Sequence, residues 1–356
     1  MFKQNYNIIG VMSGTSLDGI DLALVHFALK NSQWSFELSQ CQTIPYPDEW
    51  LNKLKVAVGF SRKKLEILNQ EYTVYLGKII SNFITNNKIE NIDAVSSHGH
   101  TILHQPQNGF TLQIGNLPEI AFYVNQNVVC DFRVQDVDLG GQGAPLVPIG
   151  DQILFAEYDY CLNLGGFSNI SFNENNTRIA FDISPVNTVL NFYTNKLGLD
   201  FDDKGKISKS GKVNQSLLDE LNGLEFYTKC APKSLGFEFV KETILPIIEN
   251  HYLEIEDKLA TFSEHVAQQI AIVLQGKKGK MLITGGGAHN DFLIGLIKKC
   301  LPEIEIIIPA TKILEFKEAL IFALLGMLKL RDEVNVLASV TGAIKDHSSG
   351  KIYNFI

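Results

Sequence analysis

The chain has 356 residues, of which 45% are hydrophobic and 20% are charged, as in ordinary globular proteins. This length is enough for two domains, each with its own hydrophobic core. The formal net charge of −8 argues against a nucleic-acid-binding surface, because phosphate backbones require clustered Lys and Arg. The five cysteines form no Cys-x-x-Cys pair, so the sequence indicates neither a zinc site nor a disulfide framework.

The N-terminus has no apolar stretch of the kind found in signal peptides. The longest apolar run, at 319–328, is too short to span a bilayer and is typical of a buried helix. We therefore expect a cytoplasmic protein that does not bind a membrane.

The first predicted elements are two strands, at 8–12 and 20–27, joined by a turn rich in glycine and hydroxyl residues. The glycines, beginning with Gly14, allow the backbone to approach an anion closely, and Thr15 and Ser16 add hydrogen-bond donors. Asp18 places a carboxylate where a hydrated Mg²⁺ ion could link a phosphate to the protein. The turn is therefore a candidate phosphate site, with Asp18 as the metal ligand.

The rest of the first half is predicted to begin with a polar connection up to residue 47 and helices at 50–59 and 64–86. A short strand at 94–96, a loop at 97–106, a helix at 117–125 and a strand at 128–130 follow. Together with the glycine-rich stretch at 140–143, the last strand marks a boundary between two lobes. We place the N-terminal lobe at 1–130 and the C-terminal lobe at 131–356.

The predicted loop carries three histidines, His98, His100 and His104. The last two have a spacing that, on a helix, could hold one metal ion. Gly99 and Pro106 leave little room for a helix, and no acidic partner follows in register, so hydrogen-bonding roles are favoured. A metal site remains an alternative.

Two more glycine turns occur in the second half. Gly165 and Gly166 join two strands about 150 residues after the first turn, and Gly285, Gly286 and Gly287 follow a strand near 281–284. The first two turns lead into strands rather than helices, neither reads Gly-x-Gly-x-x-Gly, and no Walker lysine is present. This repeated pattern favours two related halves that bind a nucleotide.

Helices are predicted at 266–274, with a capping signal at 261–264, and at 314–330. Strands that alternate with helices are typical of α/β lobes with largely central sheets.

Three charged residues are candidates for chemistry. Asp182 ends an apolar strand before a helical pattern, a position that suits a catalytic base and a helix cap equally well. Arg133 follows a strand and could bind a carboxylate bidentately or form a salt link between lobes. Glu318 lies in an apolar helix, where the simplest interpretation is a surface position.

Segments at 10–21, 111–115, 131–133, 140–148, 285–290 and 339–343 resemble the anhydro-N-acetylmuramic acid kinase family, in order and over nearly the whole chain. The resemblance implies two related actin-like (ribonuclease H-like) α/β lobes with a nucleotide cleft between them. It implies a kinase that uses ATP and Mg²⁺, opens the 1,6-anhydro ring of this small amino sugar with water, and phosphorylates O6. The product would be N-acetylmuramic acid 6-phosphate, in peptidoglycan recycling, and the enzyme would be a homodimer.

The resemblance also assigns residues. Asp182 becomes the catalytic base, and His98, Arg133 and Glu318 become sugar-binding residues. The positions that it implies for nucleotide binding, the last three against the adenosine, are Gly14, Thr15, Ser16, Leu17, Asp18, Gly19, Ile20, Asp21, Gly165, Gly166, Gly285, Gly286 and Gly287.

The chain departs from the family in two places. The family carries its aspartate in Phe-Asp-Thr-Gly-Pro-Gly-Asn, whereas Ile183, Ser184 and Val186 here replace Thr, Gly and Gly, so we expect a differently shaped loop and leave sugar specificity open. His100 replaces the amide of the family's Ser-His-Gly-Gln. The alternatives are a different amino-sugar kinase, a metal-dependent modifying enzyme of the superfamily that uses His100 and His104, and a chaperone or filament ATPase.

Overall fold

The computed structural model describes residues 2–14 and 16–355, and the chain divides into two compact units. The first unit contains Met1–Leu154 and Phe316–Ile356, and the second contains Phe155–Glu315. The predicted division after residue 130 is therefore wrong. The chain returns to the first unit at its C-terminal end, where the strand Lys351–Tyr353 pairs with the strand Val128–Cys130.

The first unit is built on one sheet in the order β12-β6-β4-β1-β2-β3, with β5 paired to β4. Strands β1, β2 and β3 form an antiparallel meander, and β4 runs parallel to both β1 and β6. The strands are β1 (Asn5–Ser13), β2 (Ile20–Lys30), β3 (Gln33–Ile44), β4 (Ala94–Gln105), β5 (Phe110–Ile114), β6 (Val128–Cys130) and β12 (Lys351–Tyr353).

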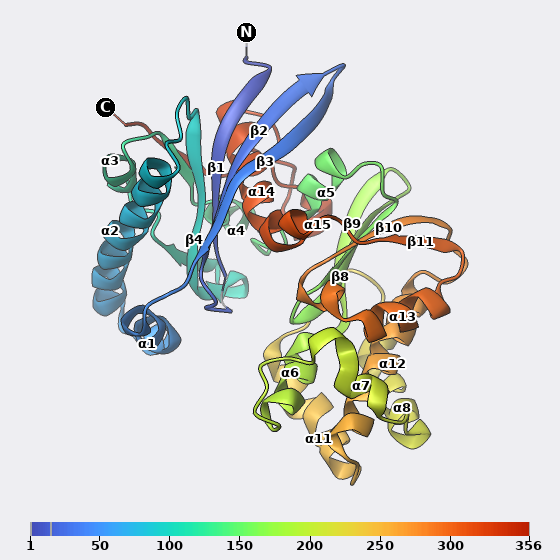
Figure 1. The fold of residues 1–356 in the computed structure, drawn as a ribbon. Helices are drawn as coiled ribbons and strands as arrows, with labels where there is room; N and C mark the ends of the chain where they lie inside the picture. The colour runs from blue at the N-terminus through green and yellow to red at the C-terminus, as the bar shows by residue number, and fades with distance from the viewer. Residues whose placement is uncertain (1, 15, 356) are drawn as a thin grey trace. The chain divides into compact units, whose positions relative to one another are not determined.

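Helices cover both faces of this sheet (Figure 1). Buried side chains of α2, including Tyr72, Leu76 and Ile80, form a core with one face, and α14 packs against the other, where Ser96 donates a hydrogen bond to the Phe322 carbonyl. The helices are α1 (Asp48–Val56), α2 (Arg62–Asn86), α3 (Ile120–Val124), α4 (Val134–Asp138), α5 (Pro148–Leu154), α14 (Thr311–Leu330) and α15 (Ala338–Thr341).

The second unit repeats the same strand plan. Its sheet has the order β11-β10-β7-β8-β9, in which β7, β8 and β9 form an antiparallel meander and β10 runs parallel to β7 and β11. The strands are β7 (Tyr160–Leu164), β8 (Phe167–Glu174), β9 (Thr177–Pro185), β10 (Gly279–Thr284) and β11 (Ile304–Ile307). A three-stranded meander continued by parallel strands in both units confirms the prediction of two related actin-like α/β lobes.

Helices bury the apolar face of this second sheet in one continuous core. The helices of this unit are α6 (Asn187–Asn195), α7 (Lys206–Ser210), α8 (Gln215–Asn222), α9 (Glu225–Thr228), α10 (Phe237–Phe239), α11 (Leu245–Asn250), α12 (Ile255–Val273) and α13 (Asp291–Cys300).

Three predicted elements differ from the structure. The polar connection before residue 47 contains β3, an edge strand whose side chains are all at least partly exposed and which therefore lacks an apolar pattern. The predicted loop at 97–106 belongs to β4 as far as Gln105, because neighbouring strands bury Ser97, His98 and His100. Helix α12 begins at Ile255 rather than near 266, and Thr261, from the predicted cap, donates within the helix to the Asp257 carbonyl.

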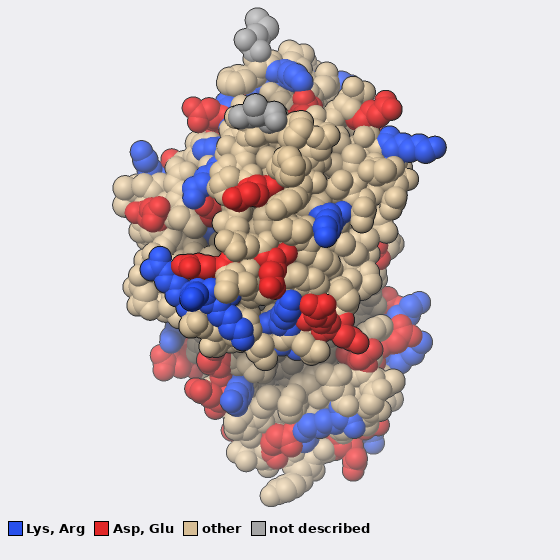
Figure 2. Space-filling model, turned by 90° about the vertical axis from the view of Figure 1, so that its left-hand side faces the viewer, with Lys and Arg blue, Asp and Glu red and all other residues tan. Residues whose placement is uncertain are grey.

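In the part of the chain that the structure describes, no helix is both long and apolar enough to cross a membrane. On the face drawn in Figure 2, basic and acidic side chains are interspersed rather than separated into patches of one sign.

Candidate functional site

The first glycine turn follows directly on β1. The Leu17 amide donates to the Gly14 carbonyl at 3.3 Å, and the Ser16 hydroxyl donates to Asp18 Oδ1 at 2.9 Å. Leu17 has a φ of +62°, a conformation that a bulky residue rarely adopts and that often accompanies function. Thr15, one of the predicted donors, lies outside the described residues.

A buried hydrogen-bonded network holds the strand end in front of this turn. Ser13 Oγ contacts Tyr46 Oη and lies 2.8 Å from His100 Nδ1, while Tyr46 Oη also contacts Tyr72 Oη. Burial lowers the pKa of His100 to about 4, so its ring is neutral at pH 7. His100 therefore supports the strand end before the first glycine turn as an uncharged hydrogen-bonding group.

The geometry gives no support to a shared metal at His100 and His104. Both residues lie on β4, where four residues span roughly 13 Å along the strand, whereas one helical turn rises only about 5.4 Å. His104 Nδ1 lies 3.0 Å from Thr111 Oγ1, a different partner from that of His100. Within residues 2–14 and 16–355, no group of three His, Cys, Asp or Glu side chains is arranged to hold a metal ion.

A cavity of about 290 Å³ in the first unit brings several predicted residues together. This volume lies near the lower limit for small-molecule pockets. The cavity is lined by Met12, Gly14, His98, Thr101, His104, Arg133 and Ala144. The first glycine turn and two of the three predicted sugar residues therefore border one space.

Arg133 and His98 form one hydrogen-bonded pair. Arg133 Nε donates to His98 Nε2 at 2.9 Å, and because a guanidinium nitrogen only donates, the proton of the neutral imidazole is on Nδ1, 2.9 Å from the Gly99 carbonyl. Burial and the Arg133 charge hold the pKa of His98 well below its ordinary value. Both nitrogens of His98 are thus engaged within the protein, so its direct contribution is to orient Arg133.

Arg133 is further held by a donation from Nη1 to the Gly143 carbonyl at 2.6 Å. Burial lowers its pKa to about 10, which leaves the guanidinium charged at neutral pH. Among the described residues, none makes a hydrogen bond to Nη2, so one edge of the fork is available to a ligand.

Glu318 is placed by the close approach of α14 to β1. A Cβ atom on Gly10 would lie 1.9 Å from the Ala319 carbonyl oxygen, so only glycine allows this approach. The Glu318 side chain reaches solvent. Desolvation by the surrounding protein raises the pKa of its carboxyl group, the charge of Arg133 lowers this pKa, and the charge of Asp21 raises it by a smaller amount. The exposed carboxylate of Glu318 therefore interacts electrostatically with Arg133.

The glycine turns of the second unit pack against each other. The Gly166 carbonyl accepts hydrogen bonds from the Val186 amide at 2.8 Å and the Thr188 hydroxyl at 2.8 Å, which ties the turn to the segment after Asp182. A Cβ atom on Gly285, whose φ is +85°, would lie 2.8 Å from the backbone of Leu164. The last two predicted turns therefore form one glycine-lined surface.

Asp182 lies at a β-bulge in β9. It pairs with Asn169 and Ser184 pairs with Ser168, so Ile183 has no partner in β8. The Leu235 amide donates to Asp182 Oδ2 at 2.8 Å. Burial raises the pKa of Asp182, and the Leu235 amide partly offsets this effect. The carboxylate does not cap α6, whose N-cap is Val186, so the helix-capping alternative is wrong.

The substituted positions after Asp182 fit without glycine. Ser184 Oγ lies 3.0 Å from Ser168 Oγ, and both side chains are fully buried. Val186 is buried in the core with a φ of −134°. Side-chain packing holds the segment after Asp182 in place, and neither position needs a left-handed backbone conformation.

Sequence reasoning overlooked the buried Tyr46 and Tyr72, which no local pattern identifies. It also overlooked Asp136, a fully buried carboxylate three residues after Arg133. The available signal was an acidic residue between Arg133 and the glycine stretch at 140–143, four positions before Gly140.

Comparisons with known proteins agree along the length of the chain. A family model described as anhydro-N-acetylmuramic acid kinase matches residues 6–355. Proteins of that name from Francisella tularensis subsp. novicida and Pseudomonas fluorescens are 33% and 35% identical, over 94% and 97% of this chain and 95% and 98% of their own lengths. The solved structure of the activator of the 2-hydroxyisocaproyl-CoA dehydratase from Clostridium difficile, with bound ADPNP, is similar at 16% sequence identity and a TM-score of 0.42. The match covers 91% of this chain and 96% of the activator chain.

Proposed function

This chain belongs to the anhydro-N-acetylmuramic acid kinase family, and we propose that Asp182 is the general base of its reaction and Arg133 the partner of the sugar's carboxylate. The family reaction uses ATP to open the 1,6-anhydro ring and phosphorylate O6, in peptidoglycan recycling. The observation that carries our assignment is a carboxylate that a β-bulge and the Leu235 amide hold in place, with a pKa raised by burial.

Asp182 takes a proton from water as the water oxygen bonds to the anomeric carbon. The bond from this carbon to O6 breaks, and O6 bonds to the γ-phosphorus as the bond from this phosphorus to the ADP oxygen breaks. A glycosidase needs a second carboxyl group to protonate the leaving oxygen, whereas here the γ-phosphoryl group captures it. A raised pKa makes the ionised form of Asp182 a stronger base.

The glycine turns bind the nucleotide in this proposal. Gly14 and Ser16 supply donors to the phosphates from the first unit, Gly165 and Gly166 do so from the second, and residues 285–287 contact the adenosine. The packing of the last two turns against each other supports this division of roles.

Asp18 is the proposed protein ligand of Mg²⁺. Its carboxylate is exposed and, like that of Asp21, acts electrostatically on Glu318. A carboxylate is the hard oxygen donor that Mg²⁺ prefers. The lack of a three-residue ligand group among residues 2–14 and 16–355 suits an ion that is held mainly by phosphates and water. Such an ion would offset the phosphate charge.

Arg133 and the cavity support recognition of the acyl sugar. The lactyl group of N-acetylmuramic acid ends in a carboxylate, and the free edge of the guanidinium provides a charge-assisted donor for it. We assign Glu318 to the sugar hydroxyl groups and His98 to the orientation of Arg133. On the family resemblance alone, we also propose a cytoplasmic homodimer that binds no nucleic acid.

The test follows the oxygen of water. In ¹⁸O-enriched water, the label should appear at the C1 hydroxyl of the 6-phosphosugar, read before anomeric exchange, and not in phosphate. Asp182→Asn should lower turnover by roughly 10²- to 10⁴-fold with nearly unchanged ATP affinity. Near-normal turnover of this variant would remove the base assignment, and a phosphorylated product that keeps its anhydro ring would reject the coupled reaction.

A further inference from the structure

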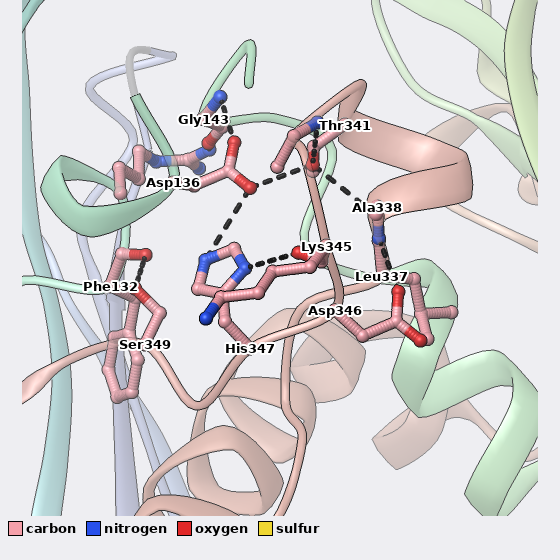
Figure 3. Close-up of polar contacts among 12 residues, drawn as sticks. Phe132, Asp136, Gly143, Leu337, Ala338, Thr341, Lys345, Asp346, His347 and Ser349 are labelled. Atoms are coloured by element: carbon pink, nitrogen blue, oxygen red, sulfur yellow. Dashed lines mark hydrogen bonds and ion pairs between the residues drawn. The ribbon is translucent and has the colours of Figure 1, made fainter. Parts of the chain in front are cut away.

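Asp136 has no part in the reaction described above, yet its carboxylate is fully buried. It lies in α4, three residues after Arg133. Oδ2 accepts the Gly143 amide at 2.6 Å, and Oδ1 accepts the Thr341 hydroxyl at 2.7 Å (Figure 3). Burying a carboxylate is costly unless such bonds compensate, so this arrangement calls for a reason.

Gly143 is held from both sides. Its amide donates to Asp136, and its carbonyl accepts from Arg133 Nη1 at 2.6 Å. Gly143 has a φ of +67°, and a Cβ atom on Gly141 would lie 2.2 Å from Asp136 Oδ2. The glycine stretch is therefore folded closely around the Asp136 carboxylate, and the orientation of the Gly143 carbonyl depends on it.

The C-terminal segment closes this arrangement within the same compact unit. The Gln142 amide donates to the Thr341 carbonyl at 2.8 Å, and the Ser349 hydroxyl donates to the Phe132 carbonyl at 2.6 Å, beside Arg133. His347 Nε2 lies 3.6 Å from Asp136 Oδ1. Figure 3 marks this contact with a dashed line. Segments far apart in the sequence thus meet at one carboxylate.

We propose that Asp136 is a positioning residue for sugar selectivity, which fixes Gly143 so that its carbonyl aims Arg133 at the sugar's carboxylate. This inference rests on the role proposed for Arg133. Without the charge of Asp136, the Gly143 amide and the Thr341 hydroxyl lose charge-assisted bonds, and the carbonyl that anchors Nη1 is free to turn. Arg133 would keep its hydrogen bond to His98 and its charge, but the orientation of its guanidinium would be less well fixed.

The test measures the binding of anhydro-N-acetylmuramic acid and of its methyl ester by calorimetry. Asp136→Asn should weaken the affinity for the acid about tenfold and change the affinity for the ester by less than about twofold, because the ester lacks the charge that Arg133 binds. Added to Arg133→Met, Asp136→Asn should weaken the affinity for the acid no further. Equal losses for acid and ester, or additive losses in the double variant, would show a merely structural role and overturn the proposal.

A matched pair at Thr341 decides the question if Asp136→Asn does not fold. Thr341→Val removes the hydroxyl that Asp136 accepts and keeps the shape, whereas Thr341→Ser retains the hydroxyl. The valine variant should lose affinity for the acid selectively and the serine variant should recover it, and any other pattern rejects the proposal. An unchanged affinity for the acid in Arg133→Met would instead refute the role of Arg133 itself.

Discussion

Gly10→Ala should damage both the stability of the first unit and its sugar site. The added methyl group would lie 1.9 Å from the Ala319 carbonyl oxygen and 3.0 Å from Ala323 Cβ, both on α14. The nearest of these is a backbone atom, which no rotamer change can move away. The helix and β1 would have to separate by about 1.5 Å to restore ordinary contact at about 3.4 Å.

The size of the effect follows from this overlap. Forcing an extra carbon into a packed core costs typically 1–3 kcal/mol, and the backbone clash places this variant near about 3 kcal/mol in the free energy of unfolding. For a unit of about 200 residues, this corresponds to a decrease in Tm of roughly 6–12 °C. Because Glu318 precedes Ala319, the displacement should also lower kcat/KM, and a shift of about 1 Å can cost about 10²-fold.

Differential scanning calorimetry and steady-state kinetics with the anhydro sugar would measure the two effects. Gly59→Ala is the matched control in the same unit, because nothing lies within 4 Å of its added Cβ and no positive φ is needed. That variant should be neutral or slightly more stable. If Gly10→Ala melted within about 1 °C of the unsubstituted protein, with unchanged kcat/KM, the reasoning about the approach of α14 would be refuted.

Three further predictions concern Asp182 and the histidines of β4. Burial raises the pKa of Asp182 above its ordinary value of 3.8, so turnover should fall as the pH decreases through this raised pKa, as a pH–rate profile would show. Because the pKa of Asp182 is higher in the folded chain than in the unfolded chain, its ionised form destabilises the fold at pH values above that pKa. At pH 7 the Tm of Asp182→Asn should therefore be no lower than that of the unsubstituted protein. A lower Tm would contradict this prediction. Replacement of His100 and His104 with Gln should leave Mg²⁺-supported turnover within a few-fold, and stoichiometric zinc or iron that is lost in the double variant would favour a metal-dependent enzyme instead.

The duplicated plan could be predicted from the sequence because its signals are local. A strand, a glycine turn and a second strand recur at Gly14 and at Gly165, and hydrophobic periodicity identified the strand at 128–130 and the apolar helix near 319–328. The edge strand β3 and most of β4 could not be found in this way. Their polar residues are accommodated by neighbours that are distant in the sequence, and local periodicity does not report such neighbours.

The candidate site divides in the same manner. Asp182 and Arg133 were predicted as site residues because Asp182 ends an apolar pattern, Arg133 follows a predicted strand, and the family resemblance assigns a role to each. What each side chain contacts was not recognisable: Leu235 bonds to Asp182 from 53 positions away, and Thr341 bonds to Asp136 from 205 positions away.

The sequence by itself therefore determined the two-lobed plan and the three glycine turns, since both depend on residue types within a few positions of one another. The tertiary structure alone decided where the lobes divide, which ring nitrogen of His98 carries the proton and which hydrogen bonds Arg133 makes. These properties depend on burial and on hydrogen bonds between distant segments, and such bonds exist only when the folded chain excludes water and brings their partners together.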